Sequence, residues 1–145
     1  MEKGSTGKRL LRETDYALLE KELLYNDCSL IGLDADDLAV LREGEAAFLW
    51  KSPLAASLEE TEKLAQRAVR EMAPEPGQKI LATVFHLVAD MEWSLEEVER
   101  IANLIYNGIG NESMSFCYAV DFGDEGTYFS LYTAEGNVDE GEDQP

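Results

Sequence analysis

Residues 79–110 read KILATVFHLVADMEWSLEEVERIANLIYNGIG and join a long apolar run to an amphipathic repeat. The run from Lys79 to Ala89 has apolar residues at both odd and even positions, which is typical of a strand buried on both faces. Ser94 and Glu97 then have the reciprocal spacing of a capping box at a helix start. The apolar stripe that follows at helical intervals consists of Val98, Ile101, Ala102 and Ile105. The stretch predicts a strand in the middle of a sheet, followed by a helix over 94–107.

Three other segments have the spacing of helices. Apolar residues recur at intervals of three and four in each of them, which predicts helices over 14–26, 34–42 and 57–73. Ser57 and Glu60 repeat the capping-box spacing at the start of the last one. PEPG at 74–77 ends that helix, because proline cannot continue it and glycine permits the turn.

Short runs with strand character fill much of the remaining chain. Residues 45–51, EAAFLWK, are apolar enough for a strand, and residues 115–122 and 127–133 alternate between polar and apolar. GDEG at 123–126 is polar and bounded by glycines, which predicts a hairpin between the last two strands. The segment 28–33 is short and apolar, and it fits either a loop or a short strand.

The order of these elements predicts an α+β fold. Helices alternate with strands, so we expect a two-layer sandwich in which a four-stranded mixed sheet carries two amphipathic helices on one face. Those helices are 57–73 and 94–107. We also expect a flexible arm over 1–13, the folded domain over 14–135 and an acidic, disordered tail over 136–145.

The charge balance limits the classes of partner. The 145 residues include 12 Lys plus Arg and 30 Asp plus Glu, which gives a net charge of −18. Binding to nucleic acids or to anionic membrane surfaces depends on clustered cations, so neither is expected as a partner. The N-terminus has no apolar core of signal-peptide length, and no window approaches about 18 uninterrupted apolar residues. We therefore expect a cytoplasmic protein.

Few groups have the spacing of an active site. GSTGK at 4–8 lacks the preceding strand, the earlier glycine and the Ser or Thr after the lysine that a phosphate loop needs. His86 is the single histidine, and catalysis would need a Ser, Cys or acid beside it in space, so a structural role is favoured. Cys28 and Cys117 have no metal-ligand spacing. We expect no cofactor, no metal site and no autonomous enzyme.

Two carboxylates lie where the run SLIGLDADDLAVL, residues 29–41, turns into the helix predicted over 34–42. Asp34 can accept hydrogen bonds from backbone N–H groups one turn on, and Asp37 sits where the helix dipole favours an anion. Helix capping is therefore sufficient to explain both residues. Metal binding or acid–base chemistry is the alternative for the same pair.

Residues 31–135 resemble the C-terminal half of FtsZ, the bacterial tubulin homologue that polymerises during cell division. IGLDADDLAVLREGEAAFL, residues 31–49, looks like that family's synergy loop with the helix and strand after it. The central strand, acidic turn and Leu-Glu-Glu-Val helix of the family are similar to residues 79–110, and the last two strands also match in order. The family's motif is Asn-Leu-Asp-x-x-Asp-Val followed by Gly-Glu-Ala, and the positions that match it are Leu33, Asp34, Asp37, Leu38 and Gly44 to Ala46.

In that family the two motif carboxylates act in trans, reaching into the nucleotide site of the next subunit and positioning water against the γ-phosphate. The resemblance implies that Asp34 and Asp37 are those groups, while Gly32 replaces the Asn of the motif. A chain of 145 residues has no room for the family's GTP-binding domain. The implied function is a non-catalytic protein-interaction module, with an interface formed by Gly32, Leu33, Asp34, Asp37 and Leu38.

The implied partner is a tubulin-like GTPase or a second copy of this chain, and the module would regulate, cap or join a filament in cell division or the cytoskeleton. A different class of function stays open, because a fold does not fix a function. A small-molecule-binding or enzymatic α+β domain would share the fold alone. Similar sandwiches can hold ligands between subunits, and in that case His86, Trp93 and Tyr106 are the residues that we expect to line the site.

Overall fold

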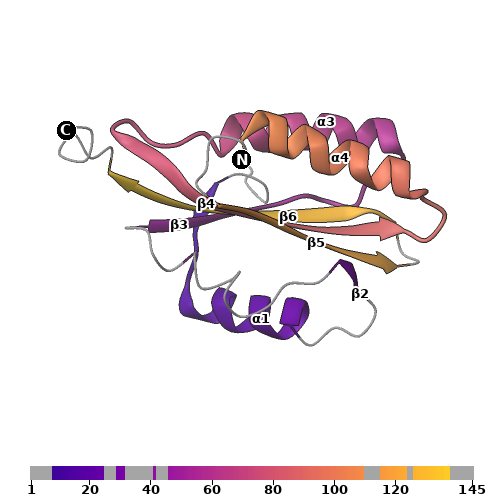
Figure 1. The fold of residues 1–145 in the computed structure, drawn as a ribbon, viewed down its shortest axis with the longest axis horizontal. Coiled ribbons are helices and arrows are strands. Elements are labelled where there is room, and N and C mark those ends of the chain that lie inside the picture. The colour runs from indigo at the N-terminus through magenta and orange to yellow at the C-terminus, as the bar shows by residue number, and fades with distance from the viewer. Residues whose placement is uncertain are drawn as a thin grey trace.

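One mixed sheet runs through the middle of the molecule, with two helices on one face and a third on the other (Figure 1). The computed structural model describes residues 8–24, 29–31, 41, 46–109, 115–123 and 126–137. Among these residues the sheet has six strands, in the spatial order β1-β3-β6-β4-β5-β2. The strands are β1 Arg9–Leu10, β2 Ser29–Ile31, β3 Ala46–Lys51, β4 Gln78–Asp90, β5 Ser115–Gly123 and β6 Tyr128–Asn137. The helices are α1 Glu13–Leu24, α3 Leu58–Glu71 and α4 Leu95–Gly108.

The central strand is β4, and it is covered on both faces. It pairs in parallel with β5 and antiparallel with β6. Phe85, Leu87 and Ala89 belong to the larger core cluster under α3 and α4, whereas Ala82 and Val84 belong to a second cluster on the other face. This arrangement confirms the central, doubly buried strand that the apolar run predicts.

Aromatic rings hold the larger cluster together where β3, β4 and β6 lie side by side. Phe129 stacks on Trp50 with ring centroids 5.6 Å apart, and its ring lies tilted against Phe85 at 5.5 Å. Trp50 Nε1 donates a 2.7 Å hydrogen bond to Glu71 Oε1, so the buried indole keeps a polar partner. That hydrogen bond, together with one from Arg67, lowers the pKa of the Glu71 carboxyl.

The predicted hairpin between the last two strands is wrong. β4 lies between β5 and β6, which both pair with it. Gly123 and Thr127 both lie at the carboxyl end of β4, where Met91 N donates to Gly123 O at 3.0 Å and Asp90 N donates to Thr127 Oγ1 at 3.0 Å. The polar GDEG sequence indicates a turn, but a local pattern does not say which strand will be the neighbour. A strand that is apolar on both faces gains most by taking the central place.

The sheet also has two strands more than the four predicted. β1 and β2 contain two and three residues, too few for an alternating pattern to be read from the sequence. The two predicted helices on one face are confirmed as α3 and α4, and α1 adds partial cover on the opposite face (Figure 1). Tyr16 of α1 packs against the second cluster, and so do Leu11 and the buried Leu41.

One of the two predicted capping boxes is complete. At the start of α4, Glu97 N donates to Ser94 Oγ at 3.2 Å and Ser94 N donates to Glu97 Oε1 at 2.8 Å. At α3, Ser57 Oγ accepts from Glu60 N as expected, but the Glu60 carboxylate accepts from Ala56 N, one residue earlier than predicted. Both helix starts are capped, because each arrangement satisfies backbone N–H groups that the helix leaves free.

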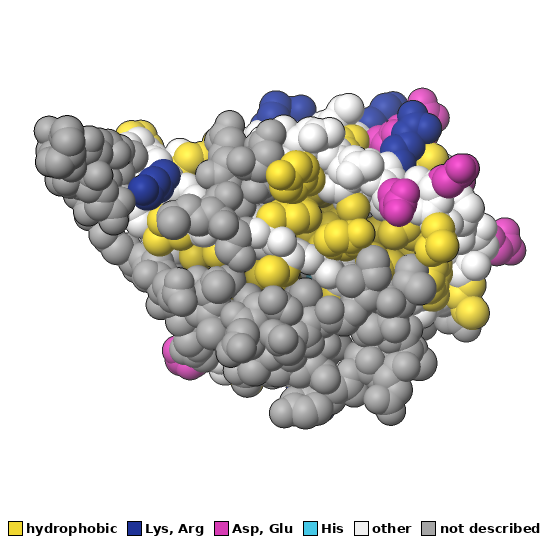
Figure 2. Space-filling view, viewed as in Figure 1, with side chains coloured by type: hydrophobic (Ala, Val, Ile, Leu, Met, Phe, Trp, Pro, Cys, Tyr) yellow, Lys and Arg dark blue, Asp and Glu magenta, His cyan; other side chains and the backbone are white. Residues whose placement is uncertain are grey.

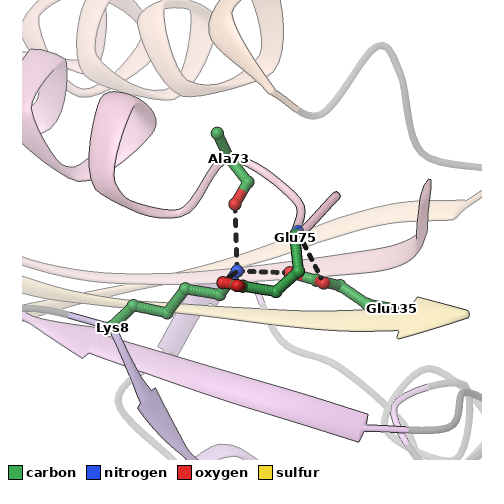
Figure 3. Close-up of polar contacts among 4 residues, drawn as sticks. All are labelled: Lys8, Ala73, Glu75 and Glu135. Carbon is green, nitrogen blue, oxygen red and sulfur yellow. Dashed lines mark hydrogen bonds and ion pairs between the residues drawn. The ribbon is translucent and has the colours of Figure 1, made fainter. Parts of the chain in front are cut away.

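A buried ion pair ties the start of the described chain to the end of β6 (Figure 3). Lys8 Nζ lies 2.5 Å from Glu135 Oε2, and it also donates to Glu75 Oε2 at 3.0 Å and to Ala73 O at 2.9 Å. Glu135 is 1% exposed and takes a second hydrogen bond from Glu75 N. The ammonium lies 4.3 Å from the centre of the Phe48 ring. A carboxylate buried this deeply needs a cation, and Lys8 provides it.

The structure extends ordered contacts into the segment expected as an arm over 1–13. Lys8 is held by Glu135, β1 pairs with β3 through Arg9 and Leu10, and α1 begins at Glu13. β6 runs to Asn137 and so passes the domain end expected at 135. Residues 1–7 and 138–145, which hold the rest of the predicted arm and tail, lie outside the described residues.

We expect Lys8→Met to lower the free energy of unfolding by about 3 kcal/mol, because it leaves the Glu135 carboxylate buried without its cation. Urea unfolding followed by circular dichroism measures this. The matched control is the double variant Lys8→Met/Glu135→Met, which removes both charges and should recover most of the loss. Equal losses of stability in the single and double variants would contradict this role of the Lys8–Glu135 ion pair.

A second expectation concerns pH. Arg9 holds Asp15 through two hydrogen bonds of 2.9 and 3.0 Å, and they lower the pKa of the Asp15 carboxyl well below its usual value. When folding lowers the pKa of a carboxyl group, the group stabilises the folded state fully at a pH above its pKa in the unfolded chain, which is about 3.9 for Asp. This stabilisation is lost as the pH falls below that value. Arg9→Gln should therefore cost up to about 1 kcal/mol at pH 7 and less in acid.

Unfolding of the wild type and Arg9→Gln between pH 2 and 7 measures this difference. In an Asp15→Asn background the effect of Arg9→Gln should be small and independent of pH. A difference that grows as the pH falls would contradict the assignment.

Candidate functional site at the β2 and β5 edge

The five predicted interface residues, Gly32, Leu33, Asp34, Asp37 and Leu38, lie outside the described residues. The structure describes the strand that leads into them. β2 pairs antiparallel with β5 at the edge of the sheet, with Ser29 opposite Asp121 and Ile31 opposite Val120. The predicted interface segment therefore begins one residue after an edge strand that is bound to β5.

A buried acid–base pair lies in the strands beside β2. His86 on β4 and Asp121 on β5 are 7% and 4% exposed, and His86 Nε2 is 2.7 Å from Asp121 Oδ2. Alternation along β4 puts His86 on the same face as Val84, the face that α1 partly covers. Sequence reasoning left His86 without a partner. The signal that points to one is an acid at an inward position of CYAVDF, residues 117–122.

Ser130 lies directly across from His86 on the other side, in β6. Asp121, His86 and Ser130 thus follow one another across three neighbouring strands, which is the order that nucleophilic catalysis uses. Within the described part of the chain, however, no hydrogen bond joins His86 to Ser130, and Ser130 is 5% exposed. The described residues thus form a buried acid–base pair beside an edge strand, and among them no nucleophile is hydrogen-bonded to His86.

One oxygen of this pair has no hydrogen-bond partner among the described residues. Asp121 Oδ1 is buried and accepts no hydrogen bond from the residues that the structure describes. A buried polar atom without a partner costs free energy, so the His86 contact carries most of the stabilisation of this carboxylate. The pair therefore fixes β4 against β5, and it does so at the residue that faces β2.

The residues proposed for a ligand site do not line one cavity. Trp93 lines an open pocket of about 460 Å³ at the end of β4, whereas His86 lies in the opposite face of the sheet. Tyr106 packs edge-on against Phe116 at 5.2 Å. Within one chain, His86, Trp93 and Tyr106 therefore do not come together at one site.

Two further kinds of feature, a metal-ligand cluster and a membrane-spanning helix, do not occur in the described ranges. No group of three or more His, Cys, Asp or Glu side chains there has an arrangement that could hold a metal ion. No described helix is long and apolar enough to cross a membrane.

No protein-family model and no curated protein sequence matches the chain. Its structure is similar to that of an empty FtsZ dimer from M. jannaschii, with a TM-score of 0.55 and 19% identity over 85% of this chain and 38% of that one. It is also similar to TubZ of Bacillus thuringiensis serovar israelensis in GDP-form protofilaments, with a TM-score of 0.52 and 14% identity over 75% of this chain and 30% of that one. CetZ2 from Haloferax volcanii, in a GTPgS-bound protofilament, gives a TM-score of 0.50 and 14% identity over 88% of this chain and 37% of that one.

These likenesses show that the chain has the fold of the FtsZ/tubulin C-terminal domain, as the sequence resemblance implies. At such low identities they show the fold alone. The chain spans 38% of the length of the FtsZ chain that it matches.

The buried pair makes a stability prediction. His86→Leu should lower the free energy of unfolding by about 2 to 3 kcal/mol, because both oxygens of Asp121 then lack a described partner. Replacing both groups, as in His86→Leu/Asp121→Val, should cost much less, since no buried polar group is left over. Urea unfolding of both variants measures this, and a double variant that loses as much as the single one would overturn the proposed role of the pair.

Proposed function

We propose that the chain is a non-catalytic protein-interaction module of the cytoplasm that binds a tubulin-like filament subunit and regulates, caps or joins the filament. One observation carries the proposal. The fold that covers most of this chain also occurs in an FtsZ dimer and in protofilaments of TubZ and CetZ2. In those proteins the domain belongs to chains that contact one another.

The contact surface in this proposal is the segment that begins at the end of β2. The sequence of that segment resembles the FtsZ synergy loop, and Asp34 and Asp37 match its two carboxylates. β2 gives the segment a fixed origin on the sheet, because it pairs with β5 through Val120 and Asp121. The contact of His86 with Asp121 holds β5 in place at the position where β2 pairs with it. In this proposal any help with GTP hydrolysis is given in trans, to the nucleotide of the partner.

The test uses a tubulin-like GTPase from the same cell. Light scattering follows its assembly with and without this protein, and sedimentation of the filaments detects the bound chain. We expect the wild type to co-sediment and to change the extent of assembly. Asp34→Ala/Asp37→Ala should abolish both effects while costing the protein itself only about 1 kcal/mol for each lost cap.

The matched control is Glu96→Ala/Glu99→Ala. This control also removes two negative charges, but from exposed positions of α4. This control should bind like the wild type. Equal weakening of both variants would reduce the effect to general charge and contradict the interface, and wild-type protein that neither sediments nor changes assembly would overturn the filament role. Gel filtration of the protein alone tests the second copy as partner.

A further inference from the structure

A pocket opens at the end of the sheet where β4 stops, away from the residues used so far. Three separate parts of the chain form it: the segment after β3, the turn after β4 and the residues just before β6. Its volume is about 460 Å³. The residues that matter for its chemistry are Leu54, Glu60, Asp90, Glu92, Trp93 and Thr127.

The walls of the pocket are fixed by hydrogen bonds between its three parts. Thr127 is 2% exposed, and its carbonyl accepts from Ala55 N at 2.8 Å while its hydroxyl accepts from Asp90 N at 3.0 Å. Trp93 N donates to Asp90 O at 2.9 Å, which closes the turn after β4. The pocket is thus formed before any ligand arrives, and preformed sites lose less entropy on binding.

The charge of the pocket is negative. Asp90 Oδ1 accepts from Glu92 N at 3.0 Å and Glu60 Oε1 accepts from Ala56 N at 2.6 Å, so each of these carboxylates is oriented through one oxygen and keeps the other. No Lys or Arg of the described residues forms an ion pair with Glu60, Asp90 or Glu92. Lys63, three positions after Glu60 on α3, does not reach it. Three carboxylates at one pocket, with no ion-paired Lys or Arg among the described residues, favour a positively charged ligand.

The surroundings of the pocket are apolar. Leu54 lines the pocket and is 58% exposed, and Trp93 lines it with its side chain half-buried. Met91 and Leu95 are 66% and 59% exposed and lie two residues before and after Trp93 in the sequence. Figure 2 shows apolar side chains gathered with acidic ones at the end of the molecule where β4 and β5 stop. An apolar rim of this kind would give nothing to a free metal ion or a small amine, but it can cover neighbouring side chains of a peptide.

We propose that this pocket binds an arginine side chain of a partner protein, within a segment whose neighbouring residues are apolar. The guanidinium forms charge-assisted hydrogen bonds with the free oxygens of Asp90 and Glu92 and lies near the indole of Trp93. The flanking apolar residues of the segment cover Leu54 and Met91. The pocket and the interface proposed after β2 share no residues. An experiment can therefore contradict one of the two proposals and leave the other intact.

The test measures fluorescence anisotropy of a labelled peptide, Gly-Ser-Leu-Leu-Arg-Leu-Leu-Ser-Gly, with the full chain. One comparison peptide carries citrulline in place of Arg, which removes the charge and keeps the shape. Another carries Ser in place of every Leu. We expect the first peptide to bind saturably and both comparison peptides to bind about tenfold more weakly or worse, as the loss of one charge-assisted contact or of the apolar contacts implies.

The protein variant is Asp90→Asn/Glu92→Gln, in which Asn keeps a side-chain oxygen for Glu92 N. Its control is Asp139→Asn/Glu140→Gln, which removes two charges from the acidic C-terminal residues. The pocket variant should lose about tenfold or more in affinity, and the control should be unchanged. Thermal melting must show that both fold like the wild type, and Glu92→Gln alone replaces the pair if the double variant melts early.

Three results would overturn the proposal. The first is absence of binding. The second is equal weakening of the pocket and control variants, which would mean attraction to the net charge of −18 in general. The third is full competition by arginine amide at the concentration of the peptide, which would mean a site for a free small cation.

Discussion

A strand that is apolar on both faces has to be covered on both faces, and the rest of this structure follows from that requirement of β4. Its two long edges are occupied by β5 and β6, and its two faces by different sets of side chains. α3 and α4 bury Phe85 and Leu87, while Leu11, Tyr16 and Leu41 help to close the side of Ala82 and Val84. A large hydrophobic surface removed from water at one strand thus determines where every neighbouring element lies.

The parts that could be predicted from sequence are those that depend on local patterns. The doubly apolar run gives β4, and the capping box with its stripe gives α4, because each signal sits within one element. Pairing partners are set by contacts distant in the chain. The order of β5, β4 and β6 was missed for that reason. So was the ion pair of Lys8 with Glu135, whose residues are separated by 127 positions.

The candidate site divides in the same way. The resemblance of residues 31–49 to a family motif points to an interface, and the structure describes the β2 strand that leads into it. The partner of His86 could not be read directly, because Asp121 is far away in sequence and adjacent only through the parallel pairing of β4 and β5. Its one sequence signal is a charged residue at an inward position of a strand. The pocket before β6 is formed by three separate parts of the chain, so the pattern of any one segment cannot predict it.

Amide hydrogen exchange followed by NMR tests the central claim most directly, because it measures the protection of each strand in the native protein. The account predicts that the β4 amides of Val84 to Leu87 exchange most slowly, through global unfolding, and that cross-strand contacts join β4 to both β5 and β6. Slow exchange confined to other strands, or direct cross-strand contacts between β5 and β6, would contradict it.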